Sequence, residues 1–324
     1  MKAVIFSKYG SPEVLKLAEV EKPVPKGNEV LIKVAAVVVG IEDSMQRSGR
    51  PFWGRIFTGF TTPKFPILGT EFAGEIEAVG KDVRLFHKGD QVFGVTGFRL
   101  GGNAEYVCMP ENGLLSKKLP QFSYAESAPV CGALQAWNLL VDKASIQPGQ
   151  KVLINDAAGS IGTAALQIAK ALGVEVTGVT ATDNFEFIKS LGADRTINHY
   201  RDDSASYDVV LDVTGRHSYW HYKDLLKKDG FYLTTYPAVS TLWLMFWTRL
   251  FGDRKVIFSA TGLMSVSKRL EFLKKLIPLF EKGKVRTIID KKYLLDQIVE
   301  AHKYIEQGQV RGNVVIELMG SASQ

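Results

Sequence analysis

The sequence predicts an α/β protein with two lobes, one built on a doubly wound parallel sheet and one built from short β-strands. Three observations carry this prediction. The first third of the chain consists of short Val- and Ile-rich stretches separated by Gly and Pro. From Lys151 onward, apolar strand patterns alternate with helical patterns. The final apolar stretch, Asn313 to Leu318, has the character of the first lobe's strands and not of a helix.

The first third predicts a barrel-like all-β lobe, because several short strands with Gly and Pro between them are typical of barrels. The expected strands are Met1–Phe6, Glu29–Val39, Phe72–Val79, the segment after the turn at Gly89, and Ala104–Met109.

The region after Ser123 predicts a different architecture. Ser123 and Glu126 form a capping-box pattern, and a helical stretch follows as far as Leu140. Strands and helices then alternate, which indicates parallel pairing through right-handed crossovers in a doubly wound Rossmann domain. The expected strands are Val152–Asn155, Val174–Thr180, Arg195–Ile197, Val209–Val213 and Phe231–Thr235, and the expected helices are Thr163–Leu172, Asn184–Leu191 and Tyr219–Lys227.

The C-terminal part predicts helices at Ser267–Gly283 and Asp296–Glu306 before the last strand. We therefore expect the first lobe to complete itself after the parallel-sheet domain. The predicted boundaries are residues 1–124 and 263–324 for the β-lobe and residues 125–262 for the Rossmann domain. Only the tail Gly320–Gln324 has the composition of a disordered segment.

The composition of the chain limits the classes of function that it can have. The chain has 324 residues, 46% hydrophobic and 23% charged, with a net charge of +6. This mild basic excess, without an arginine-rich run or zinc-finger spacing, argues against nucleic acid as a partner. Two cysteines, Cys108 and Cys131, do not make a disulfide framework, and the N-terminal pattern lacks a signal peptide's apolar region. We expect a cytoplasmic protein.

The segment Tyr236–Gly252 is unusually rich in Leu, Trp and Phe. It is too short to span a membrane and contains Arg249. We expect a loop or helix that packs on a pocket or on a partner subunit, with contact to a membrane surface as the alternative.

The strongest functional signal is the turn Asp156–Gly162 between an apolar strand and a helix. Strand, glycine turn and helix together are the setting in which this motif binds a dinucleotide. Gly159 lets the backbone approach the pyrophosphate, and Gly162 lets the helix pack on the strand. The helix start would hold the phosphates. The residues at this phosphate contact are Ala158, Gly159, Ser160, Ile161 and Gly162.

Two features of this region qualify the prediction. Asp156 replaces the usual first glycine, and its carboxylate would repel a pyrophosphate unless it points elsewhere. The alternative is therefore a domain of this type that has lost its ligand. At the end of the second strand Thr180 stands where NAD-specific domains carry an acid, which favours NADP(H), with NAD(H) as the alternative. Further cofactor contacts are expected from Thr182, Asn184, His199, Thr214 and Thr235.

Several motifs resemble the medium-chain dehydrogenase/reductase superfamily, in its zinc-free quinone oxidoreductase-like and NAD(P)-dependent alcohol dehydrogenase-like branch. The resemblance covers the whole chain. It implies a chaperonin-10-like (GroES-like) β-barrel lobe, a Rossmann domain and hydride transfer from a nicotinamide. The motifs are Lys8–Leu15, Pro66–Gly74, Val79–Gly80, Gly89–Gly94, the dinucleotide turn, Ser190–Asp194 and Tyr207–Asp212.

The resemblance also predicts the absence of zinc. Zinc-dependent relatives place a cysteine and a histidine where this chain has Gly40 and Thr70, and only Cys131 matches a ligand. One thiol is not a zinc site, because a catalytic zinc needs three protein ligands. In zinc-free relatives an asparagine stands at the position of Gly40, so Asp43 is the remaining candidate catalytic residue of that motif.

These expectations favour an NAD(P)H-dependent reductase of quinones, enones or similar small electrophiles, since hydride delivery to such a carbon needs no strong electrophile from the protein. Two alternatives stay open: a zinc-free alcohol dehydrogenase or carbonyl reductase, and a non-catalytic, cofactor-responsive binding protein. The segment Lys255–Ala260 resembles the strand through which relatives form homodimers, and we expect a dimer here too.

Overall fold

The computed structural model describes residues 1–215 and 217–318 and divides the chain into two compact units. Unit 1 comprises Met1–Val130 and Thr287–Gln324, and unit 2 comprises Cys131–Arg286. The division differs from the predicted boundary, because residues 263–286 lie with the parallel-sheet unit. The tail expected to be disordered lies outside the described residues.

Unit 1 is built on a seven-stranded sheet in which β6 pairs with β3 beside the main path β14-β15-β3-β4-β5-β7. A separate two-stranded sheet joins β1 and β2. The strands of unit 1 are β1 (Lys2–Ile5), β2 (Lys16–Glu19), β3 (Glu29–Val39), β4 (Glu71–Val79), β5 (Gln91–Val95), β6 (Tyr106–Pro110), β7 (Leu114–Lys117), β14 (Ile289–Leu294) and β15 (Asn313–Glu317).

The central strand β3 is buried along nearly all of its length, which explains its almost unbroken run of apolar residues. It pairs antiparallel with β4, β6 and β15. The pairing of Val314 with Val39 confirms that the last strand of the chain completes the first lobe. The core contains Ile32, Phe72, Ile76, Val314 and other aliphatic side chains with less than 10% exposure.

Among its described residues, unit 1 has four α-helices beside shorter 3₁₀ turns. They are α1 (Ile41–Ser48), α2 (Arg55–Thr58), α3 (Tyr124–Ser127) and α10 (Ile298–Glu306). At α3, Ser123 Oγ accepts from the Glu126 N–H while the Glu126 carboxylate accepts from the Ser123 N–H, so the predicted capping box is present.

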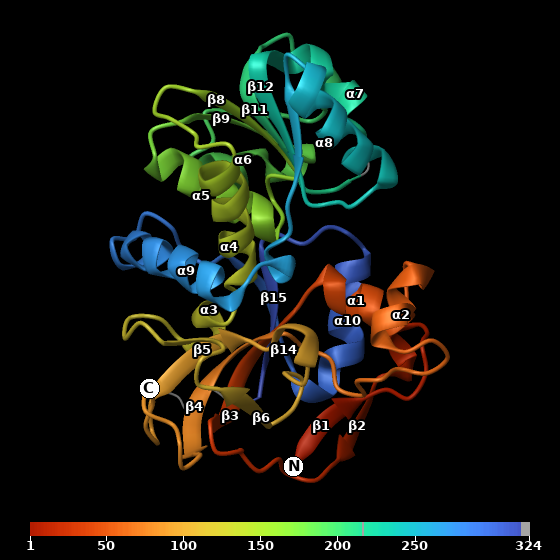
Figure 1. The fold of residues 1–324 in the computed structure, drawn as a ribbon, viewed down its shortest axis with the longest axis vertical. Coiled ribbons are helices and arrows are strands. Elements are labelled where there is room, and N and C mark those ends of the chain that lie inside the picture. Colours follow the sequence, from red (N-terminus) through yellow and green to blue (C-terminus); the bar gives the residue numbers. More distant parts are fainter. Residues whose placement is uncertain (216, 319–324) are drawn as a thin grey trace. The chain divides into compact units, whose positions relative to one another are not determined.

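Unit 2 contains a six-stranded, wholly parallel sheet with the order β10-β9-β8-β11-β12-β13. Numbered within the unit this order is 3-2-1-4-5-6, the order of a doubly wound dinucleotide-binding domain. The strands are β8 (Lys151–Asn155), β9 (Glu175–Val179), β10 (Arg195–Ile197), β11 (Tyr207–Asp212), β12 (Leu226–Thr234) and β13 (Lys255–Phe258). Figure 1 shows this sheet and its helices from one side.

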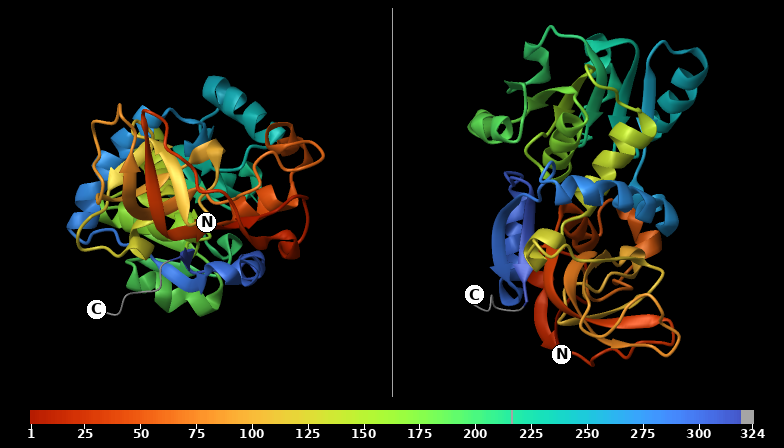
Figure 2. Two further views of the ribbon diagram at one scale, coloured as in Figure 1. Left: turned by 90° about the horizontal axis from the view of Figure 1, so that it is seen from below. Right: turned by 90° about the vertical axis from the view of Figure 1, so that its left-hand side faces the viewer.

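The helices of unit 2 cover the sheet, so successive residues of the central strands are buried on alternate faces. They are α4 (Cys131–Trp137), which continues into a π-helical turn (Asn138–Lys143), α5 (Ser160–Ala171), α6 (Phe185–Ser190), α7 (Tyr219–Tyr222), α8 (Val239–Phe251) and α9 (Val266–Glu281). Helix α9 packs against α4, which is why it belongs to this unit. Figure 2 shows the same elements in two further views.

Candidate functional site: the carboxyl edge of the parallel sheet

The predicted dinucleotide turn joins β8 to α5 at the carboxyl edge of the sheet. Asp156 follows the last residue of β8, and Gly159 is the N-cap of α5. The Thr163 N–H donates to the Gly159 carbonyl at 2.9 Å, which is the first backbone bond of the helix. The N–H groups before it point out of the helix end, where an anion is favoured.

Two glycines of this turn have close neighbours. A Cβ at Gly162 would lie 2.0 Å from the Asp156 carbonyl oxygen, so only glycine allows α5 to pack this closely on the turn. A Cβ at Gly159 would lie 2.6 Å from Asp156 Oδ2. The predicted packing role of Gly162 therefore has a steric basis, whereas the contact at Gly159 is with a side chain that can move.

Asp156 has a left-handed backbone, with φ of 63°. Aspartate tolerates this region better than most residues, which explains how it replaces the usual glycine. Its side chain is exposed, and its carboxylate lies beside Gly159 at the start of α5. A negative charge at a helix start stabilises the helix, but it also occupies the side from which a phosphate would approach.

A buried polar network supports the neighbouring strand ends. Asn155 Nδ2 donates to Asp212 Oδ1 at 2.9 Å and to Thr214 Oγ1 at 3.2 Å. Tyr232 donates to the other oxygen of Asp212 at 2.9 Å. Asp212 is fully buried. Tyr232 lies beside this carboxylate, and burial, the largest effect on its hydroxyl, raises the pKa of that hydroxyl. The network fixes Thr214 at the end of β11.

The sequence analysis identified Thr214 but missed Asn155 and Asp212. The available signal was a polar residue closing an apolar strand in each case. The other predicted strand-end residue, Thr235, donates to the Val213 carbonyl at 3.3 Å and so joins the ends of β11 and β12.

The end of β9 is uncharged, as predicted. Asn184 Nδ2 donates to Thr180 Oγ1 at 3.2 Å, which brings two predicted cofactor residues together. Thr182 is exposed in the adjoining 3₁₀ turn. A backbone hydrogen bond also positions Thr180, because its N–H donates to the Ile197 carbonyl at 3.1 Å.

An aromatic cluster follows β10 and β11. The ring of His199 lies 4.4 Å from Tyr200, and the ring of His217 lies 5.1 Å from Tyr200. The Arg201 guanidinium lies 5.9 Å from the Tyr200 ring centre. His199 Nδ1 accepts from the Arg201 N–H at 3.1 Å, which fixes the orientation of the imidazole. These flat rings and the cation stand on loops that follow two strands of the same sheet.

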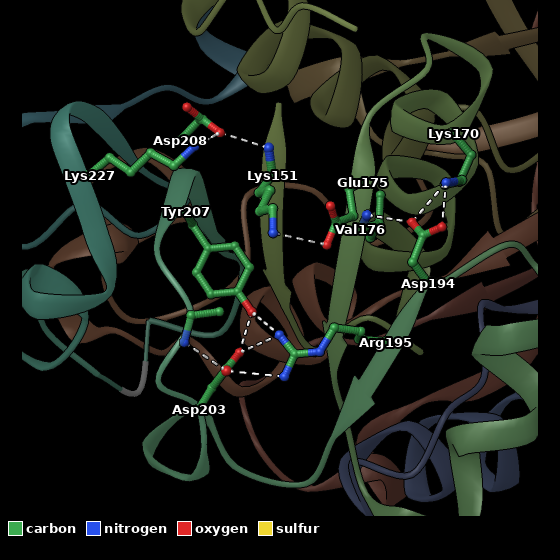
Figure 3. A network of polar contacts seen from close by, with 11 residues as sticks. Lys151, Lys170, Glu175, Val176, Asp194, Arg195, Asp203, Tyr207, Asp208 and Lys227 are labelled. Carbon is green, nitrogen blue, oxygen red and sulfur yellow. Dashed lines mark hydrogen bonds and ion pairs between the residues drawn. The ribbon is translucent and has the colours of Figure 1, made fainter. Parts of the chain in front are cut away.

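Paired charges occupy the opposite, amino edge of this sheet (Figure 3). Asp208 accepts from the Lys151 N–H and from Lys227 Nζ, while Asp194 pairs with Lys170. Arg195 pairs with Asp203 at 3.1 Å, so it is not available to a ligand at the carboxyl edge as a spare cation.

The candidate catalytic residue Asp43 lies in unit 1, at the start of α1. Its Oδ2 accepts from the Gly40 N–H at 2.9 Å, and its Oδ1 accepts from the Gly69 N–H at 3.1 Å. Burial raises the pKa of Asp43 to about 7, although these two N–H donors oppose the shift. The carboxyl group therefore joins the segment that contains Gly40 to the segment that contains Gly69.

Other candidates have structural partners. Gln135 donates to the Ser259 carbonyl at 2.7 Å and accepts from the Thr261 N–H at 2.8 Å, so it fixes the segment after β13. Among residues 1–215 and 217–318, no three His, Cys, Asp or Glu side chains are grouped so that they could hold a metal ion.

The sheet order and the glycine turn at the carboxyl edge define unit 2 as a dinucleotide-binding domain. Comparisons with known proteins agree. Residues 26–120 match the family model "Alcohol dehydrogenase GroES-like domain", and residues 191–316 match "Zinc-binding dehydrogenase". A chloroplastic quinone-oxidoreductase from Triphysaria versicolor is 33% identical, with 98% of each chain covered. A 2-methylene-furan-3-one reductase from Solanum lycopersicum is 31% identical over 98% of this chain and 79% of the relative.

The solved structure of a quinone oxidoreductase from Coxiella burnetii has a TM-score of 0.86 and 30% identity, covering 98% of this chain and 99% of that one. The chain belongs to the medium-chain dehydrogenase/reductase superfamily, in its quinone oxidoreductase-like branch. This confirms the predicted family and the pairing of a GroES-like lobe with a Rossmann domain.

Proposed function

We propose that the protein is an NAD(P)H-dependent oxidoreductase that reduces quinones, enones or related small electrophiles. The observation that carries the proposal is the turn at Asp156–Gly162, in which Gly159 is the N-cap of α5 and the first N–H groups of the helix favour an anion. The full-length similarity to a quinone oxidoreductase and to a furanone reductase supports the substrate class.

The chain's own residues bind and orient the cofactor. The N–H groups at the start of α5 hold the pyrophosphate, and the Asn155–Asp212 network keeps Thr214 at the sheet edge. When bound, the dihydronicotinamide supplies the hydride. Reduction of a conjugated electrophile requires the protein to position both reactants, and the added proton can come from water.

The cofactor is NADP(H) in our proposal, with NAD(H) as the weaker ligand. The hydroxyls of Thr180 and Thr182 and the amide of Asn184 give the end of β9 neutral donors for a 2′-phosphate. Arg201 adds a cation near the same end of the sheet. An acid at Thr180 would repel that phosphate.

We further propose that catalysis needs no zinc and that Asp43 acts as a positioning residue. Both of its oxygens accept backbone N–H groups, so an Asp43→Asn variant would lose one of these bonds. Because its pKa is raised, the folded protein favours the protonated form of Asp43. The stabilising contribution of this group to the free energy of unfolding is therefore complete below about pH 4 and is lost as the pH rises through about 7. Urea unfolding from pH 4 to 8 should show this slope for the wild type and not for the variant.

The homodimer through the strand near Lys255–Ala260 remains part of the proposal. β13 pairs only with β12 among the described residues, so it is an edge strand of the sheet. A second copy could extend the sheet there. A monomeric mass by sedimentation equilibrium at micromolar concentration would contradict this.

The structure contains no helix long and apolar enough to cross a membrane in the part that it describes; a cytoplasmic location is proposed and is testable by cell fractionation.

Titration with NADPH and NADH, followed by fluorescence, separates the main alternatives. Saturable binding, with NADPH tighter, is expected; no binding of either cofactor would favour a domain that has lost its ligand. NADPH consumption with 1,4-naphthoquinone, an enone and a simple aldehyde then tests the substrate class. Turnover of simple alcohols or aldehydes but not of quinones would favour the alcohol dehydrogenase alternative. Binding without any turnover would favour a cofactor-responsive binding protein. Metal analysis of the active protein tests the absence of zinc.

A further inference from the structure

Helix α8 exposes a broad apolar face on unit 2. The helix packs on β13 and buries Leu244 and Thr248. Met245 is partly buried against the core, and seven other large apolar side chains of α8 are exposed to between 48% and 88%. They are Val239, Leu242, Trp243, Phe246, Trp247, Leu250 and Phe251. Figures 1 and 2 show α8 along one side of the parallel sheet. Exposing so many large apolar groups on one helix needs an explanation.

The exposed residues form two adjacent stripes. Helical spacing of three or four residues aligns Val239, Leu242 and Phe246 in one stripe and Trp243, Trp247 and Phe251 in the next. The aromatic rings of the second stripe contact one another, with centroid distances of 6.4 Å and 4.8 Å. This face is wider than the two-position seam through which a pair of helices packs.

Charge and side-chain type favour a lipid surface over a protein partner. α8 contains no Asp or Glu, and its single charge, Arg249, lies seven residues after Leu242 and thus on the exposed face. An arginine at such a position can extend its charge to lipid phosphates. Trp and Phe are preferred at the boundary between headgroups and acyl chains. The exposed Asp253 that follows the helix is paired with Arg254, and the whole chain carries a charge of +6.

We propose that α8 docks the protein on the surface of an anionic lipid bilayer. The helix lies in the plane of the interface, with Trp243, Phe246 and Trp247 among the acyl chains and Arg249 at the phosphates. Its 13 residues span about 20 Å, which suits a helix lying on a membrane. The inference is independent of the proposed reaction, because none of these α8 residues is among the predicted cofactor contacts.

Vesicle flotation tests the proposal with the full chain. Vesicles of phosphatidylcholine alone are compared with vesicles that contain phosphatidylserine in equal parts. The protein should float with the anionic vesicles and less so as the salt concentration rises. Phe246→Gln should lower the partition coefficient by about tenfold or more, since one buried aromatic ring is worth at least that factor. Phe98→Gln is the matched control, because Phe98 is 73% exposed on unit 1.

Phospholipids with brominated acyl chains give an independent readout, because they quench only tryptophans at the depth of the bromine atoms. Quenching should occur in the wild type and disappear in a Trp243→Gln/Trp247→Gln double variant. Urea unfolding of every variant checks that the fold is intact. Absence of flotation with either vesicle, or equal partitioning of Phe246→Gln and Phe98→Gln, would overturn the proposal. So would a dimer that Phe246→Gln converts to monomer without any lipid binding, since α8 would then be an interface between copies.

Discussion

The two edges of the parallel sheet in unit 2 differ in their charged side chains. At the amino edge, lysines and arginines pair with aspartates such as Asp194, Asp203 and Asp208. At the carboxyl edge, none of the predicted cofactor residues is Asp, Glu, Lys or Arg, and Asp156 is the one acid of the turn. Stability and ligand binding are thus assigned to opposite ends of the same strands, as in doubly wound sheets generally.

This separation predicts that substitutions at one edge leave the function of the other intact. The variants below test it, from the largest expected effect to the smallest.

Gly162→Ala should have the largest effect. Its Cβ would lie 2.0 Å from a backbone oxygen, so α5 must move away from the turn. We expect NADPH affinity to fall by about a hundredfold or more, because small displacements of a binding group are that costly. Unfolding free energy should fall by about 1–3 kcal/mol. Fluorescence titration and urea unfolding measure both. Gly262→Ala is the control, since a Cβ there meets nothing within 4 Å; equal effects of the two variants would refute the steric argument.

Asp203→Asn removes the ion pair with Arg195 at the amino edge. Burial alone would raise the pKa of Asp203, but hydrogen bonds from Tyr207, the Ala205 N–H and Arg195 hold it below its usual value. Its stabilisation is therefore present above about pH 4 and is lost as the pH falls through the lowered pKa. We expect the variant to lose about 1–3 kcal/mol at pH 7 and to lack the acid-side slope. Its NADPH affinity should stay unchanged. A large loss of affinity would show that the amino edge affects cofactor binding and would contradict the comparison.

Thr180→Asp changes cofactor choice at the carboxyl edge. A carboxylate there repels a 2′-phosphate and accepts from ribose hydroxyls, so the ratio of kcat/KM for NADPH over NADH should fall by about tenfold or more. Steady-state kinetics with both cofactors measures this ratio. Ser190→Asp places the same charge on an exposed position at the end of α6 and should leave the ratio unaltered. An unchanged ratio in Thr180→Asp would mean that the 2′-phosphate does not approach β9.

Asp156→Asn should have the smallest effect and the opposite sign. Asparagine accepts the left-handed backbone of this position, so the variant removes charge without straining the turn. We expect NADPH to bind about three- to tenfold more tightly, with a smaller gain at high salt because the repulsion is screened. Weaker binding would show instead that the carboxylate orders the turn for the phosphates.

Local patterns predicted several strands well. The buried strand Glu29–Val39 and the partly exposed strand Arg195–Ile197 have the predicted bounds, and Asn313 begins the last strand as expected. The dinucleotide turn was also predictable, because all of its geometry comes from residues close together in sequence.

Non-local contacts were not predictable in this way. The helix expected over Tyr219–Lys227 ends at Tyr222, because β12 begins at Leu226 and continues through Asp229, whose φ is 64°. Leu226 pairs with Tyr207 of β11, and a register shift then carries the chain to Phe231, which pairs with Val209; no local pattern encodes this irregularity. The partners of Asp212 lie on three different strands or loops for the same reason. The amphipathic pattern of α9 likewise does not say which unit it packs on.

Hydrogen–deuterium exchange with and without NADPH tests the central claim most directly, because it locates the cofactor on the sheet. The account predicts slower exchange at the carboxyl edge, in the segments around 156–163, 180–184 and 213–215, and no change at the amino edge around Lys151, Asp194 and Asp208. Protection confined to the amino edge, or no protection at saturating NADPH, would contradict the assignment of the cofactor to the turn at Asp156–Gly162.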